Sequence, residues 1–96
     1  MSVTANQAAN RYEIMVDGAL AGYAEYRLDP AGAGTITFTR TVVEDAFDGQ
    51  GVGSRLARGA LDDARGRGLR VVAQCPFIRG WIDRHPDYAD LLAESP

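Results

Sequence analysis

The chain contains no lysine, and all ten of its basic residues are arginine. It has a single cysteine, Cys75, and a single histidine, His85. One cysteine excludes an internal disulfide, and too few ligands remain for a structural zinc site, so we expect no bound metal. The net charge of -3 argues against nucleic acid or an anionic membrane as the main partner.

Long apolar runs are also missing, and so is a charged segment followed by an apolar one near the start. We therefore expect neither a membrane span nor a secretory signal, and we predict a soluble, cytoplasmic protein. The length of 96 residues suits one domain. Residues 1–10 are small and polar, which predicts a flexible, frayed end, and residues 11–96 then form the single domain.

Three segments of the first half have strand patterns: residues 11–16, 20–28 and 35–43. The first alternates apolar and polar residues, as a half-buried strand does. The third is rich in β-branched residues and is the strongest strand candidate. Its alternation places Ile36, Phe38, Arg40 and Val42 on one face.

Two turns separate these strands. Asp17 and Gly18 are a strong two-residue hairpin signal, because both central positions of such a turn favour positive φ. The segment 29–34 is a looser, glycine-rich turn. The three strands should therefore be antiparallel neighbours.

The second half alternates helix and strand. Apolar residues at helical spacing predict a helix over 51–67, with Gly66 and Gly68 ending it. Residues 69–74 predict a short buried strand and 77–84 a second helix, which Pro86 should stop at His85. Residues 87–96 form a short tail. A strand, helix and strand in this order require a parallel crossover.

The bend before the first helix carries the chemical signal. Gly49, Gly51 and Gly53 remove side chains where a ligand could approach the backbone. Their N–H groups lie at the positive end of the helix dipole, which suits a phosphate or pyrophosphate. Close helix–strand packing or a flexible bend would explain the glycines equally well. A dinucleotide-binding loop is excluded because the preceding strands are antiparallel, and a Walker loop needs Gly-Lys-Ser/Thr.

Three motifs together resemble one family. The segment Asp48-Gly49-Gln50-Gly51-Val52-Gly53 is similar to a Q/R-x-x-G-x-G/A loop; Cys75-Pro76-Phe77 and His85-Pro86-Asp87-Tyr88 follow at the ends of the next strand and helix. This combination resembles the small single-domain GNAT-like N-acetyltransferases over about residues 35–92. The resemblance implies an abbreviated α/β (α+β) GNAT fold, a mostly antiparallel sheet with a crossover helix, a parallel strand and a C-terminal helix.

The same resemblance implies a function, acetyl transfer from acetyl-CoA to an amine by direct attack on the thioester. The cofactor would be held by main-chain donors of six loop residues and by two strand residues whose N–H could polarise the carbonyl. With Cys75, this predicted set comprises Val42, Val43, Gly49, Gln50, Gly51, Val52, Gly53 and Ser54. Arg55 or Arg58 would add positive charge.

Three side chains are catalytic candidates. Cys75 lies where a strand ends and a helix starts, a place that favours a reactive thiolate, and it could protonate the leaving thiolate or briefly accept acetyl. His85 could be the base and Tyr88 the acid. Each also has an ordinary interpretation: a buried small residue for Cys75, a helix end for His85 and core packing for Tyr88.

Two departures from the family pattern keep a second function open. The first motif position is Asp48, an anion whose side chain should point away from a pyrophosphate. Arg40 stands where members commonly carry a histidine, so no base is transferred from that position. The alternative is a CoA-binding or regulatory module with little catalysis. The acceptor is an unknown amine of a small molecule or protein, and we expect a monomer or weak homodimer.

Overall fold

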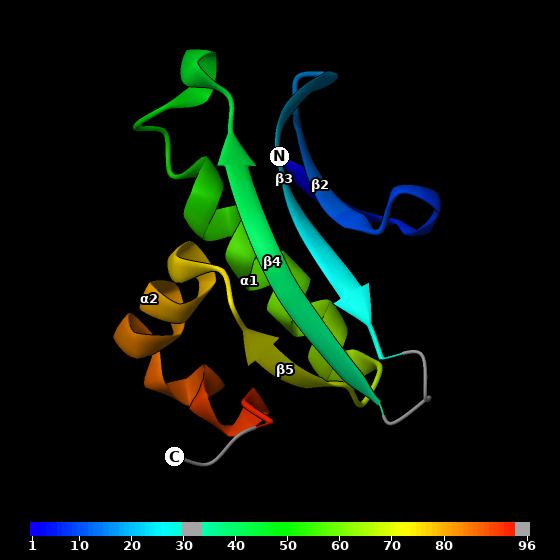
Figure 1. Ribbon diagram of the computed structural model, residues 1–96. Coiled ribbons are helices and arrows are strands. Elements are labelled where there is room, and N and C mark those ends of the chain that lie inside the picture. Colours follow the sequence, from blue (N-terminus) through cyan, green and yellow to red (C-terminus); the bar gives the residue numbers. More distant parts are fainter. Residues whose placement is uncertain (30–33, 94–96) are drawn as a thin grey trace.

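The computed structural model describes residues 1–29 and 34–93. They form one mixed α/β domain in which α1 crosses the far face of a five-stranded sheet in the view of Figure 1. The strands, in sheet order, are β1 (Ser2–Asn6), β2 (Arg11–Val16), β3 (Ala19–Leu28), β4 (Thr35–Val43) and β5 (Arg70–Ala73). The helices are α1 (Val52–Gly66) and α2 (Pro76–Arg84), with 3-10 turns η1 (Gln7–Ala9), η2 (Asp45–Phe47) and η3 (Pro86–Leu91).

The topology agrees with the predicted fold class. The first four strands are antiparallel, and β5 is parallel to β4 after the α1 crossover. The predicted hairpin turn is confirmed, because Asp17 has φ 51° and Gly18 has φ 81°. Residues 30–33 of the second predicted turn lie outside the described residues.

A β-bulge in β4 changes which residues face the core. Glu25 pairs with Arg40 but Tyr26 pairs with Phe38, so Thr39 is one extra residue in β4. Such an extra residue shifts the alternation of faces by one. Phe38 is fully buried before the bulge, whereas Arg40 after it is exposed. The prediction that Phe38, Arg40 and Val42 share a face is therefore wrong.

The N-terminal segment is a strand and not a frayed end. β1 pairs with β2 along its whole length, from Ser2 opposite Met15 to Asn6 opposite Arg11. Val3 packs over α1 at Gly59, where an added Cβ would lie only 2.8 Å from Cβ of Val3. The absence of a side chain at Gly59 lets the helix and the strand approach closely. The prediction of an irregular segment over residues 1–10 is wrong, because this tertiary contact and the pairing with β2 outweigh its weak strand pattern.

The C-terminal part is also more ordered than a tail. α2 ends at Arg84, as the proline predicted, and η3 follows at once. Beyond η3, Leu92 forms a parallel bridge with Val71 of β5. Among the helices of the described ranges, none is long and apolar enough to cross a membrane.

Candidate functional site

The site begins where β4 and β5 separate. The two strands pair only from Thr35 opposite Arg70 to Phe38 opposite Ala73. Cys75 then donates its main-chain N–H to the Phe38 carbonyl at 3.0 Å and turns away into α2. β4 continues to Val43, so its last residues pair with β3 on one side and lie beside a gap on the side where β5 has ended.

Main-chain geometry determines which β4 amide faces this gap. Glu44 donates its N–H to the Ala21 carbonyl of β3 at 2.8 Å. Opposite residues of an antiparallel pair alternate between hydrogen-bonded and non-hydrogen-bonded positions. Val42 therefore directs its N–H and C=O toward β3, and Val43 directs its own toward the gap. Of the two predicted carbonyl-polarising amides, the geometry favours Val43 and contradicts Val42.

The loop after β4 leads into α1 through two glycines with positive φ, Gly49 (78°) and Gly51 (74°). An added Cβ would meet nothing within 4 Å at either position, so the space above them is open. The first intrahelical bond of α1 runs from Arg55 N–H to the Gly51 carbonyl, and no side chain caps the helix. The N–H groups of Val52, Gly53 and Ser54 consequently have no acceptor within the helix.

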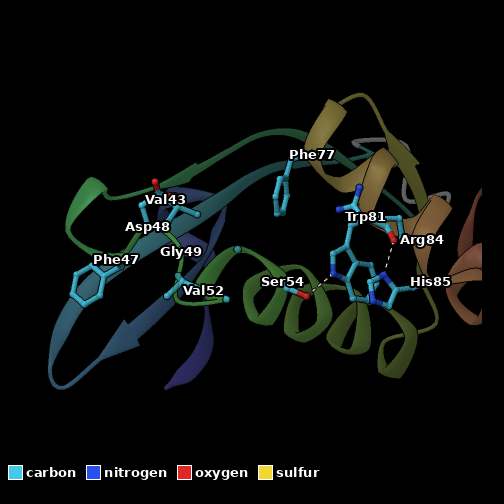
Figure 2. A pocket seen from close by; sticks show the side chains of 12 residues that line it. Val43, Phe47, Asp48, Gly49, Val52, Ser54, Phe77, Trp81, Arg84 and His85 are labelled. Carbon is cyan, nitrogen blue, oxygen red and sulfur yellow. Dashed lines mark hydrogen bonds between the residues drawn. The ribbon is translucent and has the colours of Figure 1, made fainter.

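These amides open into a cleft of about 390 Å³ between the loop, the start of α1 and α2. Figure 2 shows the loop residues at one end of the cleft and the last residues of α2 at the other. Twelve residues line it: Val43, Phe47, Asp48, Gly49, Gly51, Val52, Gly53, Ser54, Phe77, Trp81, Arg84 and His85. Six of the nine predicted cofactor-binding residues line this cleft, whereas Val42, Gln50 and Cys75 do not.

Phe77 covers the start of α1. An added Cβ on Gly53 would lie 2.8 Å from Cζ of Phe77 and 3.4 Å from Cγ2 of Val43. Gly53 thus has a packing role as well, since it admits the ring above the helix. Phe77 is 37% exposed, so the ring forms an apolar wall of the cleft next to the uncapped amides (Figure 2).

A hydrogen-bonded chain links the helix start to the end of α2. The buried Trp81 donates Nε1–H to Oγ of Ser54 at 2.9 Å, as Figure 2 shows. Ser54 accepts in this bond, and no described residue accepts its hydroxyl hydrogen. His85 stacks on Trp81 with ring centroids 3.8 Å apart, and its Nδ1 lies 2.8 Å from the Trp81 carbonyl. A carbonyl only accepts, so Nδ1 carries the hydrogen and Nε2 of the neutral ring is left to accept.

The charge distribution along the cleft is uneven. Asp48 lines the loop end and Arg84 the α2 end, beside His85. The predicted cations lie elsewhere: Arg58 stacks 5.4 Å from the Trp81 ring centroid on the side of Tyr88, and Arg55 does not line the cleft. Sequence reasoning missed Arg84, because only the packing of α2 against α1 brings it to the cleft.

Three predicted site residues are turned away from the cleft. Gln50 donates its main-chain N–H to the Phe47 carbonyl and its side-chain amide to the Ala46 carbonyl, each at 3.4 Å, and it does not line the cleft, so the structure does not support its predicted role as a donor to a ligand. Tyr88 is buried and donates its hydroxyl to Asp62 at 2.7 Å. That hydrogen bond, with burial, raises the pKa of Tyr88 and keeps its proton in place.

Cys75 is the third of these residues. It is 2% exposed, and its Sγ lies 3.3 Å from Oγ1 of Thr41. The structure therefore does not bring the three predicted catalytic side chains together: His85 lines the cleft, whereas Cys75 and Tyr88 lie behind its wall.

The fold is similar to three solved structures. A GCN5-like protein from Staphylococcus aureus has a TM-score of 0.71 and 24% identity over 99% of this chain and 90% of its own. A GNAT-family protein from Desulfovibrio desulfuricans has a TM-score of 0.57 and 25% identity, covering 82% and 52% of the two chains. The ribosomal-protein-alanine N-acetyltransferase of Brucella melitensis has a TM-score of 0.57 and 21% identity, covering 90% and 62%.

Among curated proteins, no sequence matches this chain. A family model described as GCN5-related N-acetyl-transferase matches residues 11–91, which include β2 to η3 and every residue of the cleft. The strand, loop and helix start that build the cleft thus belong to the matched region. The chain is a member of the GCN5-related N-acetyltransferase family.

Proposed function

We propose that the protein transfers an acetyl group from acetyl-CoA to an amine acceptor. The observation that carries the proposal is the uncapped start of α1, whose Val52, Gly53 and Ser54 N–H groups have no intrahelical acceptor and open into the cleft. A helix N-terminus of this kind suits a pyrophosphate. Arg84 and the free hydroxyl hydrogen of Ser54 add two further donors. The donor set therefore fits the anionic part of acetyl-CoA.

The gap beside β4 supplies the second requirement. The N–H of Val43 would donate to the thioester oxygen, where negative charge grows as the amine adds to the carbonyl carbon. The new C–N bond forms, the C–S bond breaks, and CoA leaves as a thiolate that takes a proton from solvent. The amine loses its proton to a water molecule, and that water passes a proton on to the exposed carboxylate of Glu44, the residue after Val43.

We assign His85 to the anionic end of the ligand and not to the amine. Figure 2 places Val43 and His85 at opposite ends of the site. Arg84 precedes His85 and lines the same end. A histidine in that place can accept or donate a hydrogen bond to a phosphate or ribose hydroxyl, but it is too far along the cleft to deprotonate an amine held beside Val43.

The first experiment measures binding and transfer separately. Thermal unfolding is recorded with acetyl-CoA and with CoA, and a panel of amines is incubated with acetyl-CoA and analysed by mass spectrometry. We expect stabilisation by both ligands and an acetylated amine. Stabilisation without any transfer would favour the binding or regulatory module, which the Asp48 carboxylate at the cleft and the distant histidine support. No stabilisation by either ligand would reject both functions.

The second experiment concerns Cys75 and uses the absence of lysine. The chain has one cysteine and no lysine, so an acetyl adduct that neutral hydroxylamine removes and that Cys75→Ala does not form reports a thioester on Cys75. A catalytic Cys75, as the sequence predicted, requires Cys75→Ala to slow transfer and to leave acetyl-CoA binding intact. Full transfer activity in this variant would restrict Cys75 to packing against Thr41.

A further inference from the structure

The two edges of the sheet differ in how their main-chain groups are covered. On the β5 edge, Val71 accepts the Ala93 N–H at 2.8 Å and forms a bridge with Leu92. Arg70 adds a bond from Nη2 to the Leu92 carbonyl at 2.8 Å. On the other edge, β1 pairs with β2 only, and no other segment of the described ranges pairs with it.

β1 is only five residues long, but it carries none of the side chains that protect an isolated edge. Its residues, Ser-Val-Thr-Ala-Asn, include no charge and no proline. Exposed edge strands are usually blunted by such residues, because a row of free N–H and C=O groups is a template for another strand. The strand is held firmly in place, by Val3 against Gly59 and by a 3.0 Å bond from Nδ2 of Asn6 to Glu13.

We propose that β1 pairs antiparallel with β1 of a second copy of this chain. Val3 and Ala5 pack toward the core on one face of the sheet, and residues opposite each other in a ladder share a face. In a symmetric pair of strands, a two-fold axis relates the two copies. The core faces of both copies coincide when residue 3, 4 or 5 lies on that axis. Only the register centred on Thr4 pairs all five residues, with Val3 opposite Ala5 of the second copy and Thr4 opposite itself.

This pairing leaves the proposed acetyl-CoA cleft open in both copies. The cleft is built from β4, the α1 start and α2, whereas β1 lies at the opposite end of the sheet order. Five paired residues are a small contact, so we expect a weak, concentration-dependent dimer. Its formation does not depend on the proposed enzymatic function.

Cysteine pairs test the register directly. In a Cys75→Ala background, Thr4→Cys places two thiols opposite each other at a Cα separation of about 4.5–5.5 Å, within disulfide range. We expect mild oxidation to link Thr4→Cys to itself at least about tenfold faster than Ser2→Cys. Residue 2 lies opposite residue 6 of the second copy in this register. A mixture of Ser2→Cys and Asn6→Cys should therefore give a disulfide-linked dimer that contains one chain of each variant. Equal rates at all three positions would overturn the register.

Sedimentation measures the association without cross-linking and uses the unmodified chain, Thr4→Asp and Thr4→Ser. Thr4 is exposed, so neither substitution disturbs the core. Two carboxylates facing each other on the axis should abolish the dimer, whereas the conservative Thr4→Ser should retain it. A chain that stays monomeric at all concentrations, or a dimer that Thr4→Asp leaves intact, would overturn the proposal, and acetyl-CoA binding would be unaffected by either result.

Discussion

The two ends of α1 satisfy their backbone groups in opposite ways. At the carboxyl end the chain closes on itself: Gly68 has φ 71°, and the N–H groups of Gly68 and Leu69 donate to the Arg65 and Ala64 carbonyls. Asp63 accepts from the Tyr12 hydroxyl at 2.6 Å and from Nε of Arg67 at 2.7 Å. At the amino end no side chain caps the helix. One end therefore stabilises the fold, and the other leaves donors for a ligand.

Burial strengthens this difference. Tyr12 is 2% exposed, and burial together with the bond to Asp63 raises the pKa of its hydroxyl well above the ordinary range. The raised pKa keeps the proton on Tyr12 at neutral pH, so its hydroxyl continues to donate to Asp63. Variants at the amino end should change ligand binding, whereas variants at the carboxyl end should change stability alone.

The largest expected effect is at the amino end. Gly51→Glu places a carboxylate beside the site proposed for pyrophosphate, and opposed like charges cost several kcal/mol. Affinity for acetyl-CoA, measured by calorimetry, should fall by at least about 100-fold. Gly51→Ala is the control for backbone strain. Gly51 has φ 74°, and a residue with a Cβ in that conformation costs about 1–2 kcal/mol of stability. Equal losses in both variants would contradict a charge-based site.

Asp63→Ala should break the carboxyl end without touching the cleft. The buried Tyr12 hydroxyl would lose its acceptor, which costs about 1–3 kcal/mol of unfolding free energy, measured by urea denaturation. Adding Tyr12→Phe removes the unpaired hydroxyl and should recover part of that loss. A fall in acetyl-CoA affinity for the single variant would show that the two ends are coupled.

A smaller effect is expected from the cation at the cleft. Arg84→Gln should weaken acetyl-CoA binding by about fivefold, or about 1 kcal/mol, and should reduce the salt dependence of binding. Arg55→Gln is the matched control, because Arg55 lies in the first turns of α1 but does not line the cleft. A larger loss for Arg55→Gln would return the assignment to the cation that the sequence suggested.

A pH series tests Glu13, a carboxylate that lies at neither end of α1. Hydrogen bonds from Asn6 and then Arg11 lower the pKa of Glu13, below its value of about 4.3 in the unfolded chain. Its contribution is fully present above that value and is lost as pH falls through the folded pKa. Between about pH 6 and pH 3, Glu13→Gln should lose less stability than the unmodified chain, by under about 1 kcal/mol. If the unmodified chain and Glu13→Gln lost the same unfolding free energy over this pH range, Glu13 would not contribute to stability in this way.

Local patterns predicted much of this fold. β4 has the predicted bounds because β-branched residues fill it, and α2 ends before His85 because Pro86 follows. The glycine bend was also recognisable from local sequence, because glycine tolerates positive φ, and Gly49 and Gly51 both adopt it. The bulge at Thr39 was not predictable, because it depends on the register of β4 against β3.

The membership of the site required contacts between segments distant in sequence. Gln50 belongs to the loop motif, yet it bonds back to Phe47. Arg84 carries no motif of its own, and it reaches the cleft because Trp81 of α2 packs on Ser54 of α1. Tyr88 shares a motif with His85 but donates its hydroxyl to Asp62 of α1, outside the cleft.

The sequence by itself determined the order of the elements from β2 to α2, the turn at Asp17 and Gly18, and the glycine bend that opens α1. These depend on backbone preferences of single residues and on apolar spacing, which act over a few positions. Only the tertiary structure decided that residues 2–6 form a strand, that Val43 faces the gap, and which side chains share the cleft. Each of these depends on where a second segment lies, and pairing or burial against that segment outweighs a weak local preference.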